Sequence, residues 1–367
     1  MEWRVKFVDY PRAFADMETE IMDTVRGVLA AGDLMMRQQL KDFEVHLAAF
    51  VGTSHAIGVS NCTDGLRLTL EALSVGPGDE VVTVAHTFLA TLAAIHHVGA
   101  TPVLVDVGDD YNLDPDLLDR AITPRTRAIL PVHLNGRVCQ MDRVMEVAKA
   151  HDLIVLEDSA QALGASFAGR RGGTWGAAGA FSFYPAKLLG GYGDGGAVVT
   201  NDRDLAERLL ALRDHGRVSK SGVNGWGWNC RLDNLQAALL DLKLQRLPDW
   251  IGRRRQLASM YDEALEGLDQ VKRPPAPSDS GLYFDVFQNY VIEVDCRDEL
   301  AAHLADQGIE TMTAWPVPVH HQPIGLPDFS LPRTEALALH ALSLPLTVEL
   351  EEDQVITVTN AIRSFFN

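Results

Sequence analysis

The sequence predicts an α/β fold with a mostly parallel central sheet and a smaller C-terminal α+β domain. Short apolar runs recur between residues 55 and 200, and helical patterns separate them. Strands that are apolar on both faces belong in a sheet covered by helices on both sides, as in parallel sheets. Beyond a proline-rich stretch at 274–277 the pattern changes, which indicates a second region with its own strands and helices.

The strands expected in the central sheet lie at 55–59, 80–84, 101–105, 127–132, 153–156, 180–184 and 197–200. A helical stretch follows from 232 to about 268. The second region is expected to hold a strand at 286–294, a helix at 297–307, a strand at 309–315 and a closing helix at 351–366. We place the boundary near residue 250, which gives a large domain at 1–250 and a small domain at 251–367.

Composition limits the classes of function. The chain has 367 residues, 47% of them hydrophobic, and its net charge is −18. A strongly acidic chain lacks the basic face that nucleic acids or anionic membranes require. No apolar stretch is long enough to span a membrane, and the N-terminus does not resemble a signal peptide. The 4 cysteines form no C-x-x-C pair, so we expect reduced thiols and a soluble, cytoplasmic protein.

Lys187 is the first candidate catalytic residue. It follows an apolar run at 179–186 and precedes a glycine-rich stretch at 190–196. A partly desolvated amine with small residues around it is what Schiff-base chemistry with a carbonyl group requires. A lysine at a strand end can also simply extend its ammonium group to water. The spacing G-x-G-x-x-G at 191–196 is not a dinucleotide fingerprint, because a strand and not a helix follows it.

Asp158 is the second candidate. The expected strand at 153–156 leads directly into Glu157 and Asp158, and ligands of open α/β sheets collect at the carboxyl ends of strands. A carboxylate there could hold the ring nitrogen of pyridoxal 5′-phosphate (PLP) in its protonated form. The alternative is that either acid caps the following turn.

The third candidate is an anion site at 58–70, where a strand passes through small polar residues into a helix. The first turn of a helix presents free N–H groups and a partial positive charge, which suit a phosphate group. Thr63 and Asp64 lie at this point, although both residues are also ordinary helix caps.

The three candidates occur in one order and spacing, and in these residues the chain resembles the sugar aminotransferases of the DegT/DnrJ/StrS type. The resemblance implies PLP enzymes with the type I, or aspartate aminotransferase, fold, and it spans nearly the whole sequence. Its matching segments lie at 32, 43–44, 60–64, 87–91, 131–134, 157–165, 182–187, 229–233 and 342–345.

The resemblance implies a role for each matching residue around the cofactor ring. Lys187 would hold PLP covalently and then, once released, move the proton as general acid and base. Asp158 would pair with the ring nitrogen. Gln161 matches the residue that contacts the ring hydroxyl, and Phe88 matches the aromatic side chain that stacks on the ring.

Phosphate binding, by the same resemblance, would fall to the backbone amides of Thr63 and Asp64 and to the hydroxyl of Ser182. Asn229 matches an asparagine that relatives reach across a homodimer interface to the same phosphate. Cys62 departs from the glycine that is usual in the family at this position.

Four further residues are candidates for substrate binding. His320 and His321 follow a segment, 315–318, that in the family approaches the sugar nucleotide. Arg217 and Arg231 could hold an anionic substrate locally, despite the acidic chain. We expect no metal site, because the side chains of adjacent histidines should diverge and no third ligand lies at a recognised spacing.

The resemblance thus implies transfer of an amino group from L-glutamate to a keto group of a nucleotide-linked hexose. The loop after Lys187, with Asp194, is more similar to members that aminate C3; members that aminate C4 more often have Thr-Gly-Glu. A C4 aminotransferase and a non-catalytic PLP-binding regulator are the alternatives. A PLP-dependent sugar dehydratase would have histidine in place of Lys187.

Overall fold

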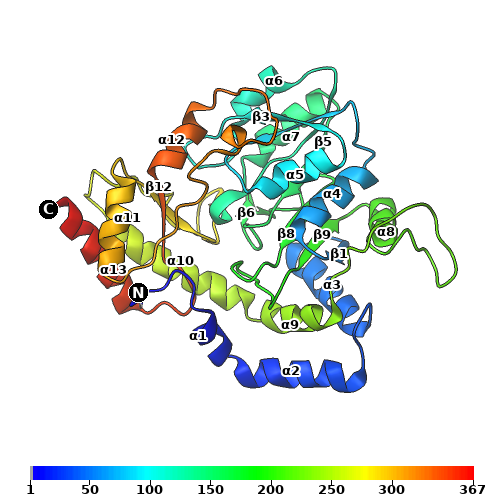
Figure 1. Cartoon of the computed structure of the whole chain (residues 1–367), viewed down its shortest axis with the longest axis horizontal. Helices are drawn as coiled ribbons and strands as arrows, with labels where there is room; N and C mark the ends of the chain where they lie inside the picture. The colour runs from blue at the N-terminus through cyan, green and yellow to red at the C-terminus, as the bar shows by residue number, and fades with distance from the viewer. Residues whose placement is uncertain (1–2) are drawn as a thin grey trace.

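A seven-stranded sheet lies at the centre of the larger part of the protein, in the order β1-β9-β8-β5-β4-β2-β3 (Figure 1). Its strands are β1 (His55–Val59), β2 (Glu80–Val84), β3 (Thr101–Val105), β4 (Thr126–Ile129), β5 (Ile154–Asp158), β8 (Ala178–Ser182) and β9 (Gly196–Thr200). Only β9 is antiparallel to its neighbours. The computed structural model describes residues 3–367, and it confirms the expected fold class.

The expected strands of this sheet are all present, with shifted ends. The run expected at 180–184 forms a strand at Ala178–Ser182, which places Phe183 and Tyr184 in the loop that leads to Lys187. Every residue of β2 and β9 is buried, in agreement with a sheet covered on both faces.

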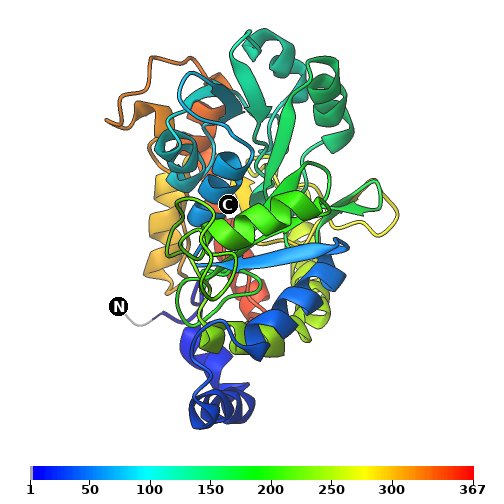
Figure 2. The same cartoon turned by 90° about the vertical axis from the view of Figure 1, so that its right-hand side faces the viewer.

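Helices lie on both sides of the sheet. Figure 2 shows α8 and α3 on opposite sides of the edge strand β1. The first eight α-helices are α1 (Tyr10–Ala15), α2 (Glu18–Ala31), α3 (Gln38–Val51), α4 (Cys62–Ala72), α5 (Leu89–His97), α6 (Leu118–Ala121), α7 (Met141–Ala150) and α8 (Arg203–Leu212). Short 3-10 helices occupy Pro115–Leu117 (η1) and Leu134–Gly136 (η2).

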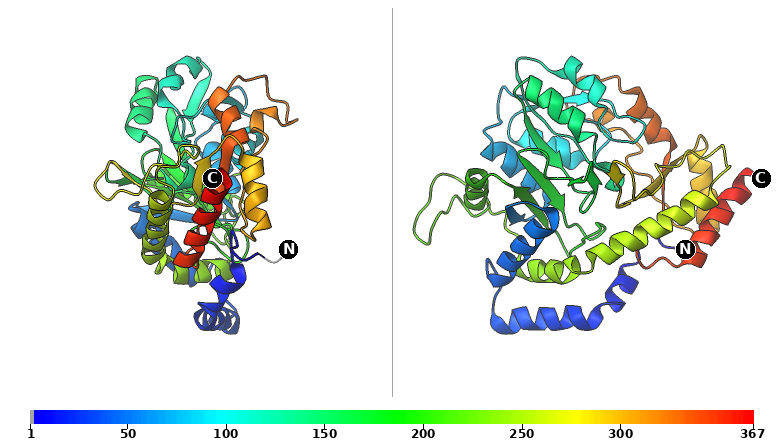
Figure 3. Two further views of the ribbon diagram at one scale, coloured as in Figure 1. Left: turned by 90° about the vertical axis from the view of Figure 1, so that its left-hand side faces the viewer. Right: turned by 180° about the vertical axis from the view of Figure 1, so that it is seen from behind.

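The helical stretch expected at 232 to about 268 is divided into α9 (Asn234–Leu244) and α10 (Leu247–Ala264). Pro248 lies in the first turn of α10, where its missing N–H costs nothing and its fixed φ favours a helix start. Helix α2 packs along α9 at the periphery of the molecule (Figure 3).

The C-terminal region is built around a two-stranded antiparallel sheet of β11 (Tyr290–Glu293) and β12 (Ala341–Leu344). Its helices are α11 (Arg297–Asp306), η3 (Val319–His321), α12 (Pro332–His340) and α13 (Glu352–Phe366). A three-stranded sheet joins β10 (Tyr283–Phe284) to β6 (Ser166–Phe167) and β7 (Arg170–Arg171) of the larger part.

Two expected strands differ in this region. The expected strand at 309–315 is wrong: Ile309 forms a single bridge to Val5, and Met312 forms a single bridge to Ser343. These two residues of the run thus pair with different partners, and the positive φ of 49° at Trp315 ends the extended conformation. A positive φ of 52° at Phe287 similarly delays the strand expected at 286–294 until residue 290.

Helix α10 contributes to two hydrophobic clusters. Leu247 and Ile251 belong to the cluster around the central sheet, whereas Leu257 and Tyr261 belong to the cluster that contains β11 and β12. Val5 from the N-terminal segment also packs in the second cluster. We propose that the two domains, 1–250 and 251–367, are joined through this helix.

Candidate active site

A cavity of about 690 Å³ opens at the carboxyl ends of the parallel strands. Its lining comes from the loops after β1, β2, β4, β5 and β8, and from segments near β11 and β12. This is the edge of an open α/β sheet at which ligands bind, and the volume is ample for a cofactor and part of a substrate. Six of the expected site residues line it: Thr63, Phe88, Asp158, Gln161, Ser182 and Lys187.

Lys187 lies in a turn after β8, in which its own N–H donates to the carbonyl oxygen of Tyr184 at 2.8 Å. Burial lowers the pKa of its side chain, and the negative charge of Asp158 opposes this shift only in part. Among residues 3–367, none accepts a hydrogen bond from this amine or pairs with it. The structure therefore presents an amine that loses its proton more readily than an ordinary lysine, as a nucleophile requires.

Asp158 ends β5 and is almost fully buried. One carboxylate oxygen accepts from the hydroxyl of Thr91 at 2.8 Å, and the other accepts from the N–H of Ala160 at 3.1 Å. Burial raises the pKa of Asp158, although these hydrogen bonds and the charge of Lys187 act against the shift. A carboxylate that is buried without a full countercharge favours a cationic partner, such as a protonated ring nitrogen.

Gln161 is oriented by two asparagines. Its Oε1 accepts from the N–H of Asn135 at 2.8 Å and from the Nδ2 of Asn289 at 3.5 Å. The amide nitrogen of Gln161 is therefore left as a donor for the cavity that this side chain lines. Asn135 and Asn289 line the same cavity, and no motif in the sequence indicates either residue.

The start of α4 forms the expected anion site, with one difference. Asn61 caps the helix by accepting the N–H of Asp64 at 2.8 Å, so this amide already has a partner. The Asp64 carboxylate contacts Ser60 at 2.6 Å and Arg67 at 3.0 Å, and it does not line the cavity. Thr63 and Ser182 do line it, and they remain the residues placed to hold a phosphate group.

Phe88 and Thr91 come from the loop and helix that follow β2. Phe88 lines the cavity and is 64% exposed, which leaves its ring free to stack on a ligand. Thr91 holds Asp158, and its hydroxyl also contacts that of Thr87 at 2.8 Å. Thr87 and Thr91 are four residues apart at the start of α5, and this spacing could have indicated that their side chains meet.

Trp315 also lines the cavity, and it is the first residue of the segment at 315–318 that the resemblance places near the sugar nucleotide. Its ring packs edge-on against His86, with the ring centroids 5.2 Å apart, and His86 in turn lies against Tyr111. Burial lowers the pKa of His86 to about 4, so this imidazole is neutral at ordinary pH. It supports the cavity wall as an aromatic ring and not as a charge.

Three expected residues lie outside the cavity. Asn229 is exposed and bridges to Asp214 in the segment between α8 and α9, which extends from the body of the molecule (Figure 3). Arg231 lies 2.9 Å and Arg217 lies 3.8 Å from the carboxylate of Asp214. Within this chain, the two arginines are paired with Asp214 and contribute no charge to the cavity.

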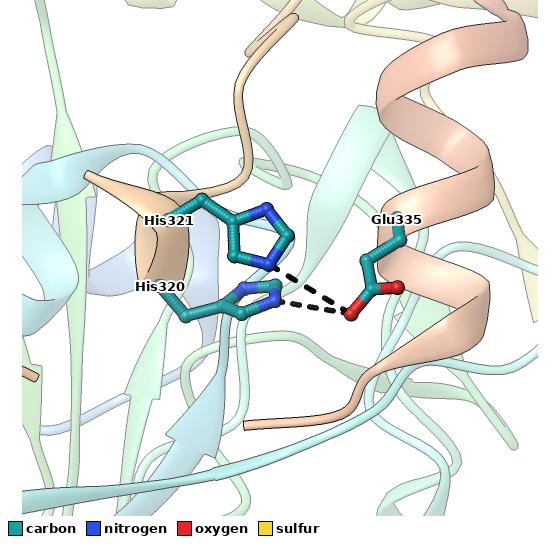
Figure 4. Close-up of side chains that lie close together, drawn as sticks. All are labelled: His320, His321 and Glu335. Carbon is teal, nitrogen blue, oxygen red and sulfur yellow. Dashed lines mark hydrogen bonds and ion pairs between the residues drawn. The ribbon is translucent and has the colours of Figure 1, made fainter. Parts of the chain in front are cut away.

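His320 and His321 are also absent from the cavity lining. Both belong to η3, and their rings face Glu335 of α12 (Figure 4). The residues of this region that line the cavity are those at 312–315. The structure therefore does not support substrate contact by either histidine in this arrangement of the chain.

The residues around the cavity fit PLP as a group. An amine without a partner faces the same space as a buried carboxylate, a side-chain amide donor and an exposed aromatic ring. A helix start with small polar residues lies beside them. Lys187 can bind the aldehyde carbon, Asp158 the ring nitrogen, Gln161 the ring hydroxyl, and Thr63 with Ser182 the phosphate.

Two further observations concern the chain as a whole. No helix in the described part of the chain combines the length and the apolar character that crossing a membrane requires. The cysteines at 62, 139, 230 and 296 are unpaired in the structure, and the first three are buried.

Known proteins resemble this chain over nearly its full length. The dTDP-3-amino-3,4,6-trideoxy-alpha-D-glucose transaminase of Streptomyces venezuelae is 44% identical, over 99% of this chain and 96% of its own. The erythromycin biosynthesis sensory transduction protein EryC1 of Saccharopolyspora erythraea is 42% identical, over 97% of this chain and 99% of its own.

Solved structures agree with the fold. The crystal structure of DesV from S. venezuelae superposes with a TM-score of 0.95 at 44% identity, covering 99% of this chain and 98% of that chain. A model of the DegT/DnrJ/EryC1/StrS aminotransferase family matches residues 15–363. The chain belongs to this family of aminotransferases.

Proposed function

We propose that this protein transfers an amino group from L-glutamate to the C3 keto group of a nucleotide-linked keto-hexose, in amino-sugar biosynthesis. As a member of its family it uses PLP. The observation that carries the proposal is the free amine of Lys187, which shares one cavity with the buried carboxylate of Asp158. The relative of 44% identity has a name that specifies a 3-amino nucleotide sugar, which supports both the substrate class and the position.

PLP supplies an electron sink that stabilises negative charge on the carbon next to the transferred nitrogen. The residues of this chain do the rest. Asp158 keeps the proton on the ring nitrogen, Gln161 orients the ring through its hydroxyl, and Phe88 covers one face. Lys187, whose amine has a lowered pKa, would serve as the base that accepts the proton of the donor carbon and as the acid that returns a proton. It would have the same two roles when the keto sugar is aminated.

The loop after Lys187 supports amination at C3. Asp194 of this loop lines the cavity, where it can influence how deeply the sugar enters. A displacement of about 1 Å in the position of a reacting carbonyl can cost roughly 100-fold in rate. The side chain at residue 194 can therefore discriminate between a 3-keto and a 4-keto sugar.

We further propose that the protein acts as a homodimer in the cytoplasm. The segment between α8 and α9, which carries Asn229, exposes large apolar side chains, including Trp226 at 96%, Val223 and Val218. Exposed apolar groups on an extended segment are typical of a protein interface. A second copy of the chain would cover them, and it would bring Asn229 to the phosphate of the neighbouring site. The free cysteines agree with a reducing compartment.

A PLP-binding regulator without turnover is the second candidate, because one relative is named as a sensory transduction protein. The two functions differ in a measurement on the purified protein. If the protein is an aminotransferase, L-glutamate alone will convert the bound cofactor to its amine form, and a keto sugar will restore the original spectrum. A regulator would show a stable spectrum with both ligands.

Amination at C3 is tested with synthetic 3-keto and 4-keto nucleotide sugars of the same hexose. We expect a higher kcat/KM for the 3-keto sugar. The matched variant Asp194→Glu introduces the side chain more common in C4 enzymes. It should reduce the ratio of kcat/KM for the 3-keto sugar to kcat/KM for the 4-keto sugar. A preference of the wild type for the 4-keto sugar would contradict the proposed position and leave the aminotransferase class unaffected.

A further inference from the structure

Three potential metal ligands converge on one point at the surface of the protein, outside the cavity. His320 and His321 lie on the 3-10 turn η3, and Glu335 lies on α12 (Figure 4). The Oε1 atom of Glu335 is 3.4 Å from the Nε2 of His320 and 4.0 Å from the Nε2 of His321. Among residues 3–367 this is the one group of three histidine, cysteine or acidic side chains whose ligand atoms lie within 4.8 Å of one another.

The two histidine rings do not diverge, contrary to the expectation for neighbouring residues. Their centroids are 4.1 Å apart, and both Nε2 atoms face the same carboxylate oxygen (Figure 4). The other adjacent pair, His96 and His97 on α5, has centroids 5.8 Å apart and is not part of any such group. Adjacency in sequence therefore does not by itself produce the convergence at 320 and 321.

The separations suit a tetrahedral zinc ion. With Zn–N and Zn–O bonds of about 2.0–2.1 Å, the ligand atoms of a tetrahedral site lie roughly 3.3–3.4 Å apart. The Nε2 of His320 and the Oε1 of Glu335 already have this separation of 3.4 Å. The Nε2 of His321, which is 4.0 Å from the same oxygen, would have to move closer to it by about 0.6 Å. Two histidines and one glutamate form a known zinc ligand set, with the fourth position left to water.

The surroundings allow a cation to enter. The side chain of His320 is fully buried, whereas those of His321 and Glu335 are 50% and 38% exposed, so the site is open on one side. The nearby carboxylate of Asp106, which caps α12, adds negative charge.

Two features limit the strength of such a site. The Nδ1 atom of His320 is buried without a hydrogen-bond partner, whereas metal-binding histidines usually donate from this second nitrogen. The Oε1 atom of Glu335 also accepts from the N–H of Leu331 at 3.1 Å. Loss of an outer partner typically costs roughly 10- to 100-fold in affinity, so we expect dissociation constants in the micromolar range.

We propose that His320, His321 and Glu335 form a zinc-binding site that fastens η3 to α12. Residues 312–315, which line the cavity, lie shortly before η3 in the chain. A metal ion at this site would hold the end of that segment in place from the outside. The proposal concerns a second site and does not depend on the reaction assigned to the cavity.

The test is calorimetric titration of Zn²⁺ into the PLP-loaded protein after removal of metals with a chelator. We expect one ion per chain and a rise in melting temperature when zinc is added. His321→Gln and Glu335→Gln should each weaken binding by roughly 10-fold or more and abolish the rise in melting temperature. His320 is left unchanged, because substitution of a fully buried side chain could impair folding.

The matched control is His97→Gln, which removes an exposed histidine from the other adjacent pair. This variant should bind zinc as the wild type does. The proposal is overturned if the wild type shows no saturable binding at micromolar zinc. It is also overturned if His321→Gln or Glu335→Gln binds as tightly as His97→Gln, because the ion would then lie elsewhere, for example at Cys296.

Discussion

At the scale of single residues, the site depends on two ionisable groups whose burial favours the neutral form of each. Lys187 has a lowered pKa and Asp158 a raised pKa, with burial as the largest cause for both. The charge of each group partly opposes the pKa shift that burial causes in the other. A bound cofactor that reacts with the amine and presents a cationic nitrogen to the carboxylate satisfies both.

The lowered pKa of Lys187 predicts the pH dependence of cofactor binding to the apoprotein. Because only the neutral amine attacks the aldehyde, the rate of PLP incorporation should rise with pH and level off below the pKa of 10.5 of an ordinary lysine. Absorbance at the wavelength of the bound cofactor gives this rate. Borohydride reduction followed by peptide mapping should place the label on Lys187, and a label on another lysine would refute the assignment.

Asp158→Asn should lose most activity and retain the fold. The neutral amide cannot hold the ring proton, so the activation barrier should rise by about several kcal/mol. The same substitution should not lower the stability of the apoprotein, in contrast to its effect on activity. A raised folded pKa means that the ionised form is destabilising, so wild-type stability falls as pH rises through that pKa.

The stability of the two apoproteins should therefore be compared at two pH values. At neutral pH, apo Asp158→Asn should melt at or above the temperature of the wild type, and this advantage should shrink in acid, where Asp158 is protonated. Thermal melts at both pH values measure the effect. Near wild-type turnover in this variant would show that Asp158 serves only the local turn.

At the scale of elements, the start of α4 is fixed by a close approach of two chain segments. A Cβ atom at Gly196 of β9 would lie 2.5 Å from the backbone carbon of Asn61, so only glycine allows β9 to pass so close. Asn61 then caps the helix through the N–H of Asp64. This cap occupies an amide that the resemblance assigned to the cofactor phosphate.

Asn61→Ala tests whether the N–H of Asp64 binds the cofactor phosphate when the cap is removed. Loss of the cap should lower the stability of the apoprotein by about 1 kcal/mol. If the phosphate receives the freed N–H, the loss should be smaller in the PLP-loaded protein. Asp202→Ala is the matched control, because Asp202 caps α8 by accepting from two amides and does not line the cavity. Denaturant unfolding with and without PLP compares the two variants.

The elements differ in how far the sequence could predict them. Strands buried on both faces are continuous apolar runs, so those of the central sheet were found, as were the residues at their carboxyl ends. The region 309–315 is also apolar in part, but its pairing depends on Val5 and Ser343, which lie far away in the chain. The contact of His320 and His321 with Glu335 depends on the placement of α12 against η3, which no local pattern encodes.

At the scale of the whole molecule, the site of a single chain is incomplete with respect to the residues the family resemblance implies. Asn229 is exposed and does not line the cavity of its own chain, and Trp226 on the same segment is 96% exposed. A homodimer that buries this segment would be expected to have an interface of roughly 2,000 Å² or more. Sedimentation should therefore give the mass of two chains at micromolar concentration.

Subunit mixing tests whether Asn229 acts in the site of the partner. Lys187→Ala and Asn229→Ala should each be strongly impaired as homodimers, the first in chemistry and the second in phosphate binding. In a two-fold symmetric dimer of one Lys187→Ala chain and one Asn229→Ala chain, one active site has both defects and the other has none.

Random mixing of the two variants puts half of the dimers in this mixed form, and each of these has one intact site of two. About a quarter of wild-type activity should therefore return. If Asn229 serves its own chain, every site carries one defect and mixing restores nothing. A return of activity would therefore mean that Asn229 acts in the active site of the other subunit. If no activity returns, the proposal of an active site shared between two subunits is wrong.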